Sequence, residues 1–151
     1  MLKISKQIIM CFKSGGKLLI CGNGGSASMS MHMAAEFVCS FENKERPPLP
    51  AIALTGNSSI LTAWSNDFKD GFENVFARQI KALGKYNDLL ITISTSGKSI
   101  NCIKAQNQAK ELEIEYIDFP RRGTNTAEIQ EFQLHIMHQI IREVEKELFP
   151  C

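Results

Sequence analysis

A short apolar run that ends in a cluster of glycines constrains the fold of this chain more than any other feature. Residues 17–21 have the length and composition of a buried strand, and the glycine turn (residues 22–26, GNGGS) comes directly after it. Glycines let the backbone turn sharply and expose its N–H groups. Ser26 is expected to cap a helix over residues 26–40. A strand, a glycine turn and a helix N-terminus in this order favour binding of an anion, most often a phosphate.

The glycine turn has a second interpretation. Turns of this kind also join strands to helices in α/β domains for packing reasons alone. The sequence matches neither the dinucleotide-binding fingerprint nor the P-loop, which has Gly-Lys followed by Ser or Thr. The phosphate interpretation therefore needs support from residues further along the chain.

The predicted helix after the glycine turn carries His32 and Glu36, which are four residues apart and project from one face. Such a pair is often a surface pair with no chemistry. Beside a phosphate-binding turn, the pair predicts an active site for a phosphorylated small molecule. Asn23, Gly24 and Ser26 of the glycine turn are then candidates for binding that substrate.

A second polar turn comes after another apolar run. The hydroxyl turn (residues 94–99, STSGKS) lies between a predicted strand over residues 89–93 and a predicted helix that runs to residue 112. Hydroxyl groups and the N–H groups of a helix start bind phosphate oxygens well. A Ser/Thr-rich helix cap without a ligand is the alternative. The turn has more hydroxyls than one cap needs, so we favour a ligand, and its hydroxyl-bearing residues are Ser94, Thr95, Ser96 and Ser99.

Strands and helices alternate along the chain. The predicted strands cover residues 17–21, 51–54, 89–93 and 114–119. The predicted helices cover residues 2–13, 26–40, 60–64, 75–83, 100–112 and 127–148. This order predicts an α/β fold, a doubly wound and mostly parallel sheet of four strands flanked by helices, with ligands at the carboxyl ends of the strands. The length of 151 residues fits a single domain.

Two segments between these elements carry further expectations. Residues 65–67 are expected to interrupt the helical pattern after residue 64. Residues 41–50 read as a polar, proline-rich loop. The charged residues of that loop are expected to be solvated, and they are Glu42, Lys44, Glu45 and Arg46. The last helix is expected to present one apolar face, made of Ile129, Phe132, Ile136, Ile140 and Val144.

Composition narrows the possible partners. The net charge is +1 and no basic run is present, which predicts neither a nucleic-acid partner nor a membrane partner. No stretch of the sequence reaches membrane-spanning length. The five cysteines are scattered without a Cys-x-x-Cys spacing, as is typical of a protein in a reducing compartment. We therefore expect a cytoplasmic location.

Several longer motifs occur in one order over nearly the whole chain. They are CGNGGSAS with HMAAEF (residues 21–37), PPLPAIALT (47–55), LTAWSND (61–67), FARQIKALG (76–84), ITISTSGKS (91–99) and IQEFQLHIMH (129–138). In these motifs the chain resembles sugar-isomerase (SIS) domains. The HMAAE motif and the pair of Gln130 and His138 are similar to those of the phosphoheptose isomerase family. The SIS fold has five strands in that family, against four predicted here.

The resemblance implies an aldose–ketose isomerase that interconverts sedoheptulose 7-phosphate and D-glycero-D-manno-heptose 7-phosphate, for the heptose of bacterial surface polysaccharides such as lipopolysaccharide. It implies a homotetramer with active sites between subunits. It also implies a divalent metal, usually zinc, held by residues that match His32, Glu36, Gln130 and His138.

The assembled residues, together with the resemblance, suggest a mechanism. Glu36 and His138 would act as the acid and base that move a proton between C1 and C2 through an enediolate. Gln130, Asn66 and Asp67 would contact the substrate, together with the two polar turns. His135, the third histidine, is expected to be structural or exposed.

One feature of the implied metal site needs a geometric explanation. Gln130 and His138 are eight residues apart, roughly 12 Å along a straight helix. They can hold one ion if the helix frays at Gln130, if both side chains lean inward, or if two chains contribute.

The chain also departs from the family pattern. Met29 replaces an Asp, Ser40 replaces an Arg expected to contact phosphate, and Glu128 replaces another Arg. Lys98 is the one candidate in the sequence for the missing cation. The helix and strand that the family has before the last helix are absent, and residues 118–120 run almost directly into residues 124–130.

These departures leave two alternatives to an active isomerase. The chain could be a phosphosugar-binding or regulatory protein with little or no activity, or it could fold only with a full-length partner. Retention of all four implied metal ligands favours the enzyme, because a binding module has no physical need for them.

Overall fold

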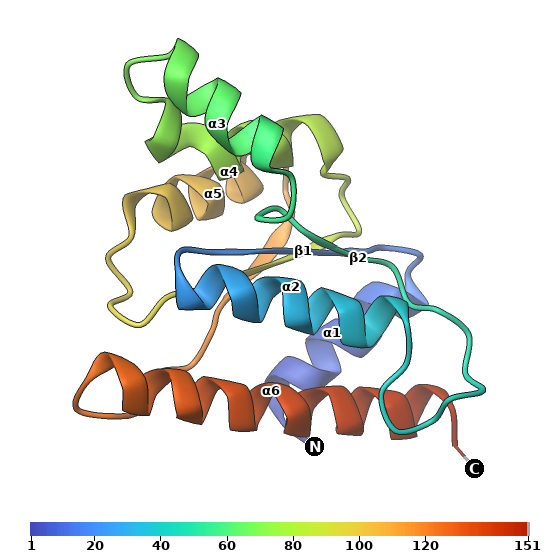
Figure 1. The fold of residues 1–151 in the computed structure, drawn as a ribbon. Helices are drawn as coiled ribbons and strands as arrows, with labels where there is room; N and C mark the ends of the chain where they lie inside the picture. Colours follow the sequence, from blue (N-terminus) through green and yellow to red (C-terminus); the bar gives the residue numbers. More distant parts are fainter. Residues whose placement is uncertain (151) are drawn as a thin grey trace.

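Four parallel strands form the centre of the computed structural model, which describes residues 1–150 (Figure 1). The strands are β1 (Leu18–Gly22), β2 (Ala51–Ala53), β3 (Leu89–Ile93) and β4 (Glu115–Asp118). Their order in the sheet is β2-β1-β3-β4, so β1 and β3 are central. This arrangement confirms the predicted α/β class with a parallel, doubly wound sheet of four strands.

Helices cover both faces of the sheet, as Figure 1 shows. One layer contains α1 (Lys3–Lys13), α2 (Gly25–Val38) and α6 (Thr126–Leu148). The other contains α3 (Ser58–Asp67), α4 (Gly71–Leu83) and α5 (Ile100–Glu111). Among residues 1–150, none of these helices is long and apolar enough to cross a membrane.

The two central strands are buried throughout and almost entirely apolar, because both of their faces are covered. Along β1, Leu18 and Ile20 point into the core under α1, α2 and α6. Leu19 and Cys21 point into the core under α4 and α5. Side chains alternate between the faces of a strand, so a strand buried on both sides reads as a continuous apolar run.

The start of α2 differs from the prediction. Gly24, with φ of 55°, occupies the N-cap position, and the helix begins at Gly25. Ser26 therefore lies inside the first turn of α2, where it is buried, and the prediction that it caps the helix is wrong. The positive φ at Gly24 explains the difference, because glycine adopts it without the steric cost that serine would meet.

Helix α3 is longer than predicted. It spans Ser58–Asp67, and the Asn57 side chain caps it by accepting a hydrogen bond from the Ile60 N–H at 3.1 Å. The expected interruption at residues 65–67 is wrong, since these residues complete the last turn. The chain turns later, before Gly71, where an added Cβ would collide with the Trp64 carbonyl. Only glycine permits this close approach of α4 to α3.

The start of α6 explains one departure from the family pattern. Asn125 caps the helix by accepting a hydrogen bond from the Glu128 N–H at 3.1 Å. The Glu128 carboxylate reaches back to the N–H and the hydroxyl of Thr124, both at 2.7 Å. These hydrogen bonds lower the pKa of Glu128. An acidic residue therefore serves helix capping at this position.

Candidate active site

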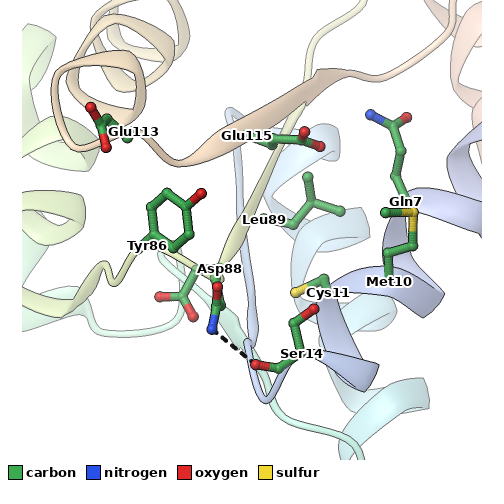
Figure 2. A pocket seen from close by; sticks show the side chains of 10 residues that line it. Gln7, Met10, Cys11, Ser14, Tyr86, Asp88, Leu89, Glu113 and Glu115 are labelled. Atoms are coloured by element: carbon green, nitrogen blue, oxygen red, sulfur yellow. Dashed lines mark hydrogen bonds between the residues drawn. The ribbon is translucent and has the colours of Figure 1, made fainter.

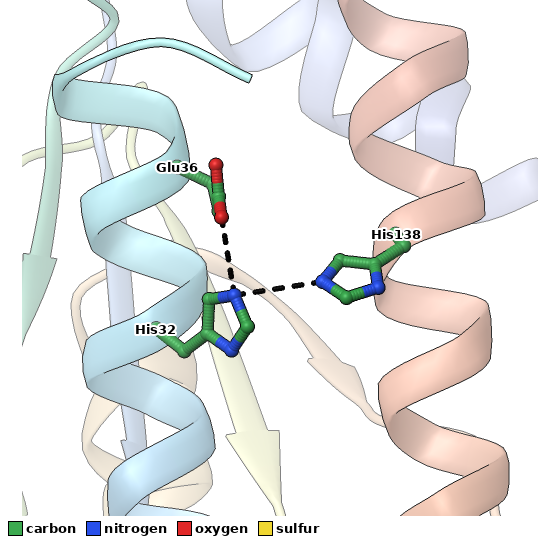
Figure 3. Close-up of side chains that lie close together, drawn as sticks. All are labelled: His32, Glu36 and His138. Atoms are coloured by element: carbon green, nitrogen blue, oxygen red, sulfur yellow. Dashed lines mark hydrogen bonds and ion pairs between the residues drawn. The ribbon is translucent and has the colours of Figure 1, made fainter. Parts of the chain in front are cut away.

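Two histidines and a glutamate converge between α2 and α6 (Figure 3). His32 Nε2 lies 3.1 Å from Glu36 Oε1 and 3.5 Å from His138 Nε2. One ligand atom from each of these residues lies within 4.8 Å of the others. The i, i+4 spacing aligns His32 and Glu36 on α2, while the parallel course of α6 beside α2 brings His138 to them (Figure 1).

The geometry of this cluster fits a metal ion. Two ligands of a tetrahedral zinc with bonds of about 2.0–2.1 Å lie about 3.3–3.4 Å apart. The 3.1 Å and 3.5 Å separations around His32 Nε2 are close to this value. Imidazole nitrogen and carboxylate oxygen are ordinary zinc donors. The three residues can therefore bind a metal.

The surroundings of His138 favour the neutral form of its imidazole by lowering its pKa. Burial lowers the pKa of His138, and the neighbouring His32 lowers it further, against the opposing effect of the Glu36 carboxylate. The ring stacks on Phe41, with centroids 5.6 Å apart and planes 21° apart. A neutral imidazole has a free lone pair, which both a metal ligand and a base require.

A buried ion pair connects the ends of the two helices that carry the cluster. Arg46 Nε donates to Glu145 Oε1 at 2.7 Å, and the two side chains are 1% and 6% exposed. Other guanidinium nitrogens of Arg46 donate to the carbonyls of Glu36 and Phe37. The expectation that Arg46 is solvated is wrong, because tertiary contacts bury it. The pair fixes the end of α2 against α6, and hence Glu36 near His138.

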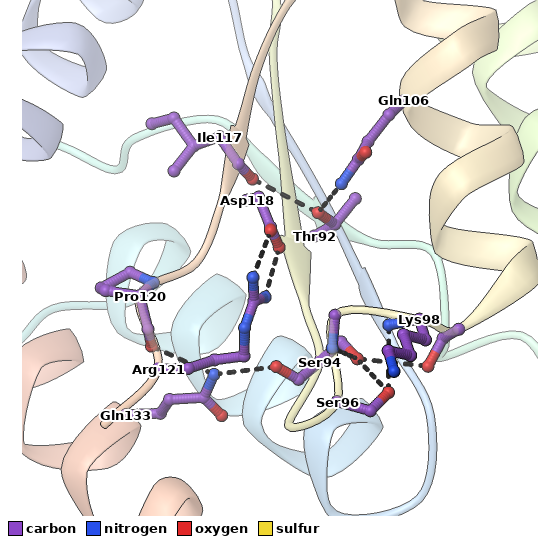
Figure 4. Close-up of polar contacts among 12 residues, drawn as sticks. Thr92, Ser94, Ser96, Lys98, Gln106, Ile117, Asp118, Pro120, Arg121 and Gln133 are labelled. Atoms are coloured by element: carbon purple, nitrogen blue, oxygen red, sulfur yellow. Dashed lines mark hydrogen bonds and ion pairs between the residues drawn. The ribbon is translucent and has the colours of Figure 1, made fainter. Parts of the chain in front are cut away.

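The hydroxyl turn lies at the carboxyl end of β3, with its side chains gathered together (Figure 4). Ser94 Oγ is 3.4 Å from Ser96 Oγ and 3.2 Å from Ser99 Oγ. The N–H groups of Gly97 and Lys98 donate to Ser94 and Ser96. The turn leads directly into α5, whose N-cap residue Ser99 makes no side-chain cap hydrogen bond.

The two polar turns are joined by side-chain amides. Asn23 of the glycine turn and Asn101 of α5 exchange two hydrogen bonds of 2.8 Å. Gln133 of α6 donates to the carbonyl of Ser94 at 3.3 Å and to that of Pro120 at 3.2 Å. These bonds hold β1, β3 and α6 in one arrangement around the carboxyl end of the sheet.

Gln130 lies apart from the cluster. An added Cβ at Gly25 would come within 3.2 Å of the Gln130 side-chain oxygen, so Gln130 sits against the first turn of α2. Helix α6 is regular from Thr126, which removes the frayed start as a way to bring Gln130 to the ion. Gln130 is roughly 12 Å from His138 along α6. Within one chain, Gln130 is placed near the glycine turn and Ser26 rather than near His32.

Asn66 and Asp67 also lie away from the cluster. They end α3, where Asn66 Nδ2 donates to Asp67 Oδ1 at 3.0 Å, and both are exposed. Helix α3 covers the opposite face of the sheet from α2 and α6 (Figure 1). One chain therefore does not bring Asp67 to His138.

A cavity of about 470 Å³ lies at the other end of the sheet (Figure 2). Residues from α1 and from the amino ends of β3 and β4 line it, among them Cys11, Asp88 and Glu115. Burial raises the pKa of the Cys11 thiol to about 12, so this thiol is not a nucleophile near neutral pH. The two polar turns are at the carboxyl end, as expected for an open α/β sheet. His32 and Glu36 lie further along α2, beside His138 of α6.

Comparison with known proteins identifies the family. The SIS domain family matches residues 1–119. A phosphoheptose isomerase from Roseiflexus sp. (strain RS-1) is 45% identical over 162 aligned positions, which cover 97% of this chain and 81% of the relative. One from Crocosphaera subtropica is 47% identical over 154 positions, which cover 91% and 77%. The chain belongs to the phosphoheptose isomerase family of SIS domains.

Solved structures agree with this assignment. A phosphoheptose isomerase from Neisseria gonorrhoeae superposes with a TM-score of 0.86 and one from Francisella tularensis with 0.88. Each is 34% identical, with 95% of this chain and 83% of the other covered. The alignment with the Roseiflexus relative spans 162 positions, which is more than the 151 residues of this chain. The chain therefore has gaps in this alignment and is shorter than the Roseiflexus phosphoheptose isomerase within the aligned region.

Sequence reasoning missed several residues around the site. Arg46, Asn101 and Gln133 hold the elements together, and Phe41 supports the His138 ring. Arg121 lies beside the hydroxyl turn. The sequence carries no local signal for these contacts, because each joins segments far apart in the chain.

Proposed function

We propose that this protein is an aldose–ketose isomerase that converts sedoheptulose 7-phosphate into D-glycero-D-manno-heptose 7-phosphate, for heptose and surface-polysaccharide synthesis. The observation that carries the proposal is the convergence of His32, Glu36 and His138 within 4.8 Å, at the interface of α2 and α6. Relatives that match nearly the whole chain bear the name phosphoheptose isomerase.

The proposed chemistry moves one proton between neighbouring carbons. A base removes a proton from C1 of the ketose, the electron pair forms the C1–C2 double bond, and the O2 oxygen accepts a proton. Delivery of a proton to C2 and loss of the O1 proton then give the aldehyde. Glu36 and His138 are the proposed acid and base. The lowered pKa of His138 favours the neutral imidazole, whose ring nitrogen can accept a proton while it is not bound to a metal.

A divalent metal, with zinc as the proposed ion, would be held by His32, Glu36 and His138. When bound, it supplies positive charge for the oxygen on which negative charge develops. Gln130 is the fourth ligand in our prediction. Its position against Gly25 favours a substrate contact within its own chain.

The substrate would lie along α2. Ser94, Thr95, Ser96 and Ser99 are the proposed phosphate-binding residues, with Asn23, Gly24, Ser26 and Gln130 binding the phosphate or sugar hydroxyls. His32 comes seven residues after the start of α2, roughly 10 Å along the helix. This separation suits a substrate whose phosphate and reacting carbons are at opposite ends.

We propose a homo-oligomer, a tetramer as in our sequence prediction, with active sites between subunits. The placement of Asn66 and Asp67 supports this, because they reach a site only if they serve a neighbouring copy. Cys11, Cys21, Cys39 and Cys102 are all free thiols, which supports the proposed cytoplasmic compartment.

The proposal is tested by hydrogen exchange. Purified protein is incubated with zinc and sedoheptulose 7-phosphate in deuterated water, and the product is analysed for deuterium at C2. We expect label in the aldose product, and a loss of about 10²–10⁴-fold in rate for His138→Gln. His135→Gln is the matched control, since His135 is exposed on the same helix and should leave the rate within twofold. Absence of label in the wild type, with and without zinc, would leave only a sugar-phosphate-binding protein.

A further inference from the structure

Arg121 lies against the hydroxyl turn. An added Cβ at Gly97 would meet its Cζ and Nη2 at 2.9 Å and its Nη1 at 3.2 Å, so the guanidinium covers Gly97. Gly97 has φ of +67° and lies in the middle of the turn. Lys98, which belongs to the turn itself, is the other cation there, and its side chain is exposed.

Asp118 fixes the guanidinium in this position. Arg121 Nη1 donates to Asp118 Oδ1 at 2.8 Å and Nη2 donates to Oδ2 at 2.7 Å. Asp118 is the last residue of β4, which pairs with β3 just before the hydroxyl turn. The two hydrogen bonds use two of the five N–H groups of Arg121 and leave three for a ligand. The Arg121 side chain is 31% exposed, so a ligand can reach it.

The hydroxyl turn needs such a cation. Apart from the exposed Lys98, the turn offers only hydroxyls and backbone N–H groups, which are neutral donors, whereas a sugar phosphate carries close to two negative charges at neutral pH. Ser40 and Glu128 occupy the positions where the family resemblance predicts arginines. Glu128 is engaged with Thr124 in capping α6 and adds negative charge.

We propose that Arg121 is the cationic phosphate-binding residue of this protein and that Asp118 positions it over the hydroxyl turn. The inference rests on the proposed function, since it assigns the substrate phosphate to residues 94–99. It makes Arg121 a determinant of specificity for phosphorylated over unphosphorylated sugars. An isolated surface ion pair would have no such effect on ligand affinity.

The test measures ligand affinity without turnover. Dissociation constants for inorganic phosphate, sedoheptulose 7-phosphate and unphosphorylated sedoheptulose are determined by calorimetry for the wild type, Arg121→Ala, Arg121→Lys and Arg122→Ala. A charge-assisted hydrogen bond lost from Arg121 should weaken both phosphate ligands about 10- to 100-fold in Arg121→Ala. Arg121→Lys keeps the positive charge but loses the bidentate geometry of the guanidinium, so its dissociation constants for the phosphate ligands should lie between those of the wild type and Arg121→Ala.

Arg122→Ala is the matched control, because it removes the same charge from the neighbouring exposed position. It should change each dissociation constant by less than twofold, and the affinity for unphosphorylated sedoheptulose should be the same in all variants. Equal effects of Arg121→Ala and Arg122→Ala would overturn the inference. Phosphate binding that depends on Arg121 without any deuterium exchange would refute the isomerase and keep the inference. Exchange with unchanged phosphate affinity in Arg121→Ala would refute the inference alone.

Discussion

At the scale of single residues, His32 Nε2 faces two partners, Glu36 and His138. If His32 Nε2 carries a proton, that one proton is shared between Glu36 Oε1 at 3.1 Å and His138 Nε2 at 3.5 Å and cannot bond both of them well. If His32 Nε2 lacks the proton, its lone pair faces the negatively charged Glu36 carboxylate at 3.1 Å, and the two repel each other. A metal ion among the three ligand atoms removes this conflict, because all three then donate lone pairs to it.

Zinc binding is therefore expected to stabilise the folded chain through this cluster. At a zinc concentration 100 times the dissociation constant, ligand linkage contributes about 2.7 kcal/mol. In a chain of this size that raises the midpoint of thermal unfolding by about 5–10 °C. Chelation should reverse the shift, and His32→Ala should abolish it, as measured by differential scanning calorimetry. His135→Ala is the control and should respond to zinc as the wild type does.

Residue-level prediction succeeded where the signal was local. The spacing of His32 and Glu36 on one helix placed them side by side, as the structure confirms. His138 was assigned to the same site only through the family resemblance, since its sequence neighbours contain nothing that points to α2. Phe41 and Arg121 were missed because their contacts depend on how distant segments pack.

At the scale of elements, the loop between α2 and β2 is anchored to α6 through Glu145. Its carboxylate accepts hydrogen bonds from the N–H groups of Phe41, Glu42 and Asn43 in addition to Arg46. Burial alone raises the pKa of Glu145, but these hydrogen bonds outweigh it, and the pKa lies below the usual value. The ionised carboxylate therefore stabilises the loop and the adjacent active-site cluster.

Replacement of one partner should strongly destabilise the fold. Glu145→Gln leaves the buried Arg46 guanidinium without its counter-ion, which typically costs about 3–5 kcal/mol. Because the pKa of Glu145 is lower in the folded chain, its contribution is complete above the usual pKa of a glutamate and is lost as pH falls through the folded value. The difference in unfolding free energy between wild type and variant should shrink below about pH 4.5. Urea denaturation from pH 7 to pH 3 measures this, and a constant difference would contradict it.

The elements themselves were mostly predictable, with errors where tertiary contacts decide the outcome. For α6, the expected apolar face included Ile140 and Val144, which are buried. It also included Ile129 and Phe132, which are only partly buried, while the polar Gln133 is fully buried. Hydrogen bonds from Gln133 Nε2 to the carbonyls of Ser94 and Pro120 offset part of the cost of burying this side chain, whose Oε1 has no partner. A hydrophobicity pattern does not include such bonds.

At the scale of the whole molecule, the shortened chain leaves β4 as an edge strand. Glu115 and Asp118 on β4 are exposed, and charged side chains on an edge strand disfavour pairing with another sheet. Exposed large apolar residues occur on both sides of the sheet, with Met10, Met31, Val38 and Leu134 on the α1, α2 and α6 side and a further set around α3, α4 and α5. This further set includes Ile60, Phe68, Phe72, Ile100 and Ile103. Since α3 also carries Asp67, the α3, α4 and α5 side is the one we expect to contact other copies in the proposed homo-oligomer.

Phe72→Asp is expected to disrupt that assembly. Phe72 lies in the first turn of α4 with 61% of its surface exposed, so the substitution removes little packing within the chain and should preserve the fold. A carboxylate buried in an interface without a partner would be strongly unfavourable. Light scattering coupled to size-exclusion chromatography should show a loss of mass, and deuterium exchange should fall with it if Asp67 serves a neighbouring copy. Tyr86→Asp is the matched control, because Tyr86 is 71% exposed at the amino end of the sheet and should leave the mass unchanged. A Phe72→Asp protein that keeps the mass of an oligomeric wild type would place the interface elsewhere.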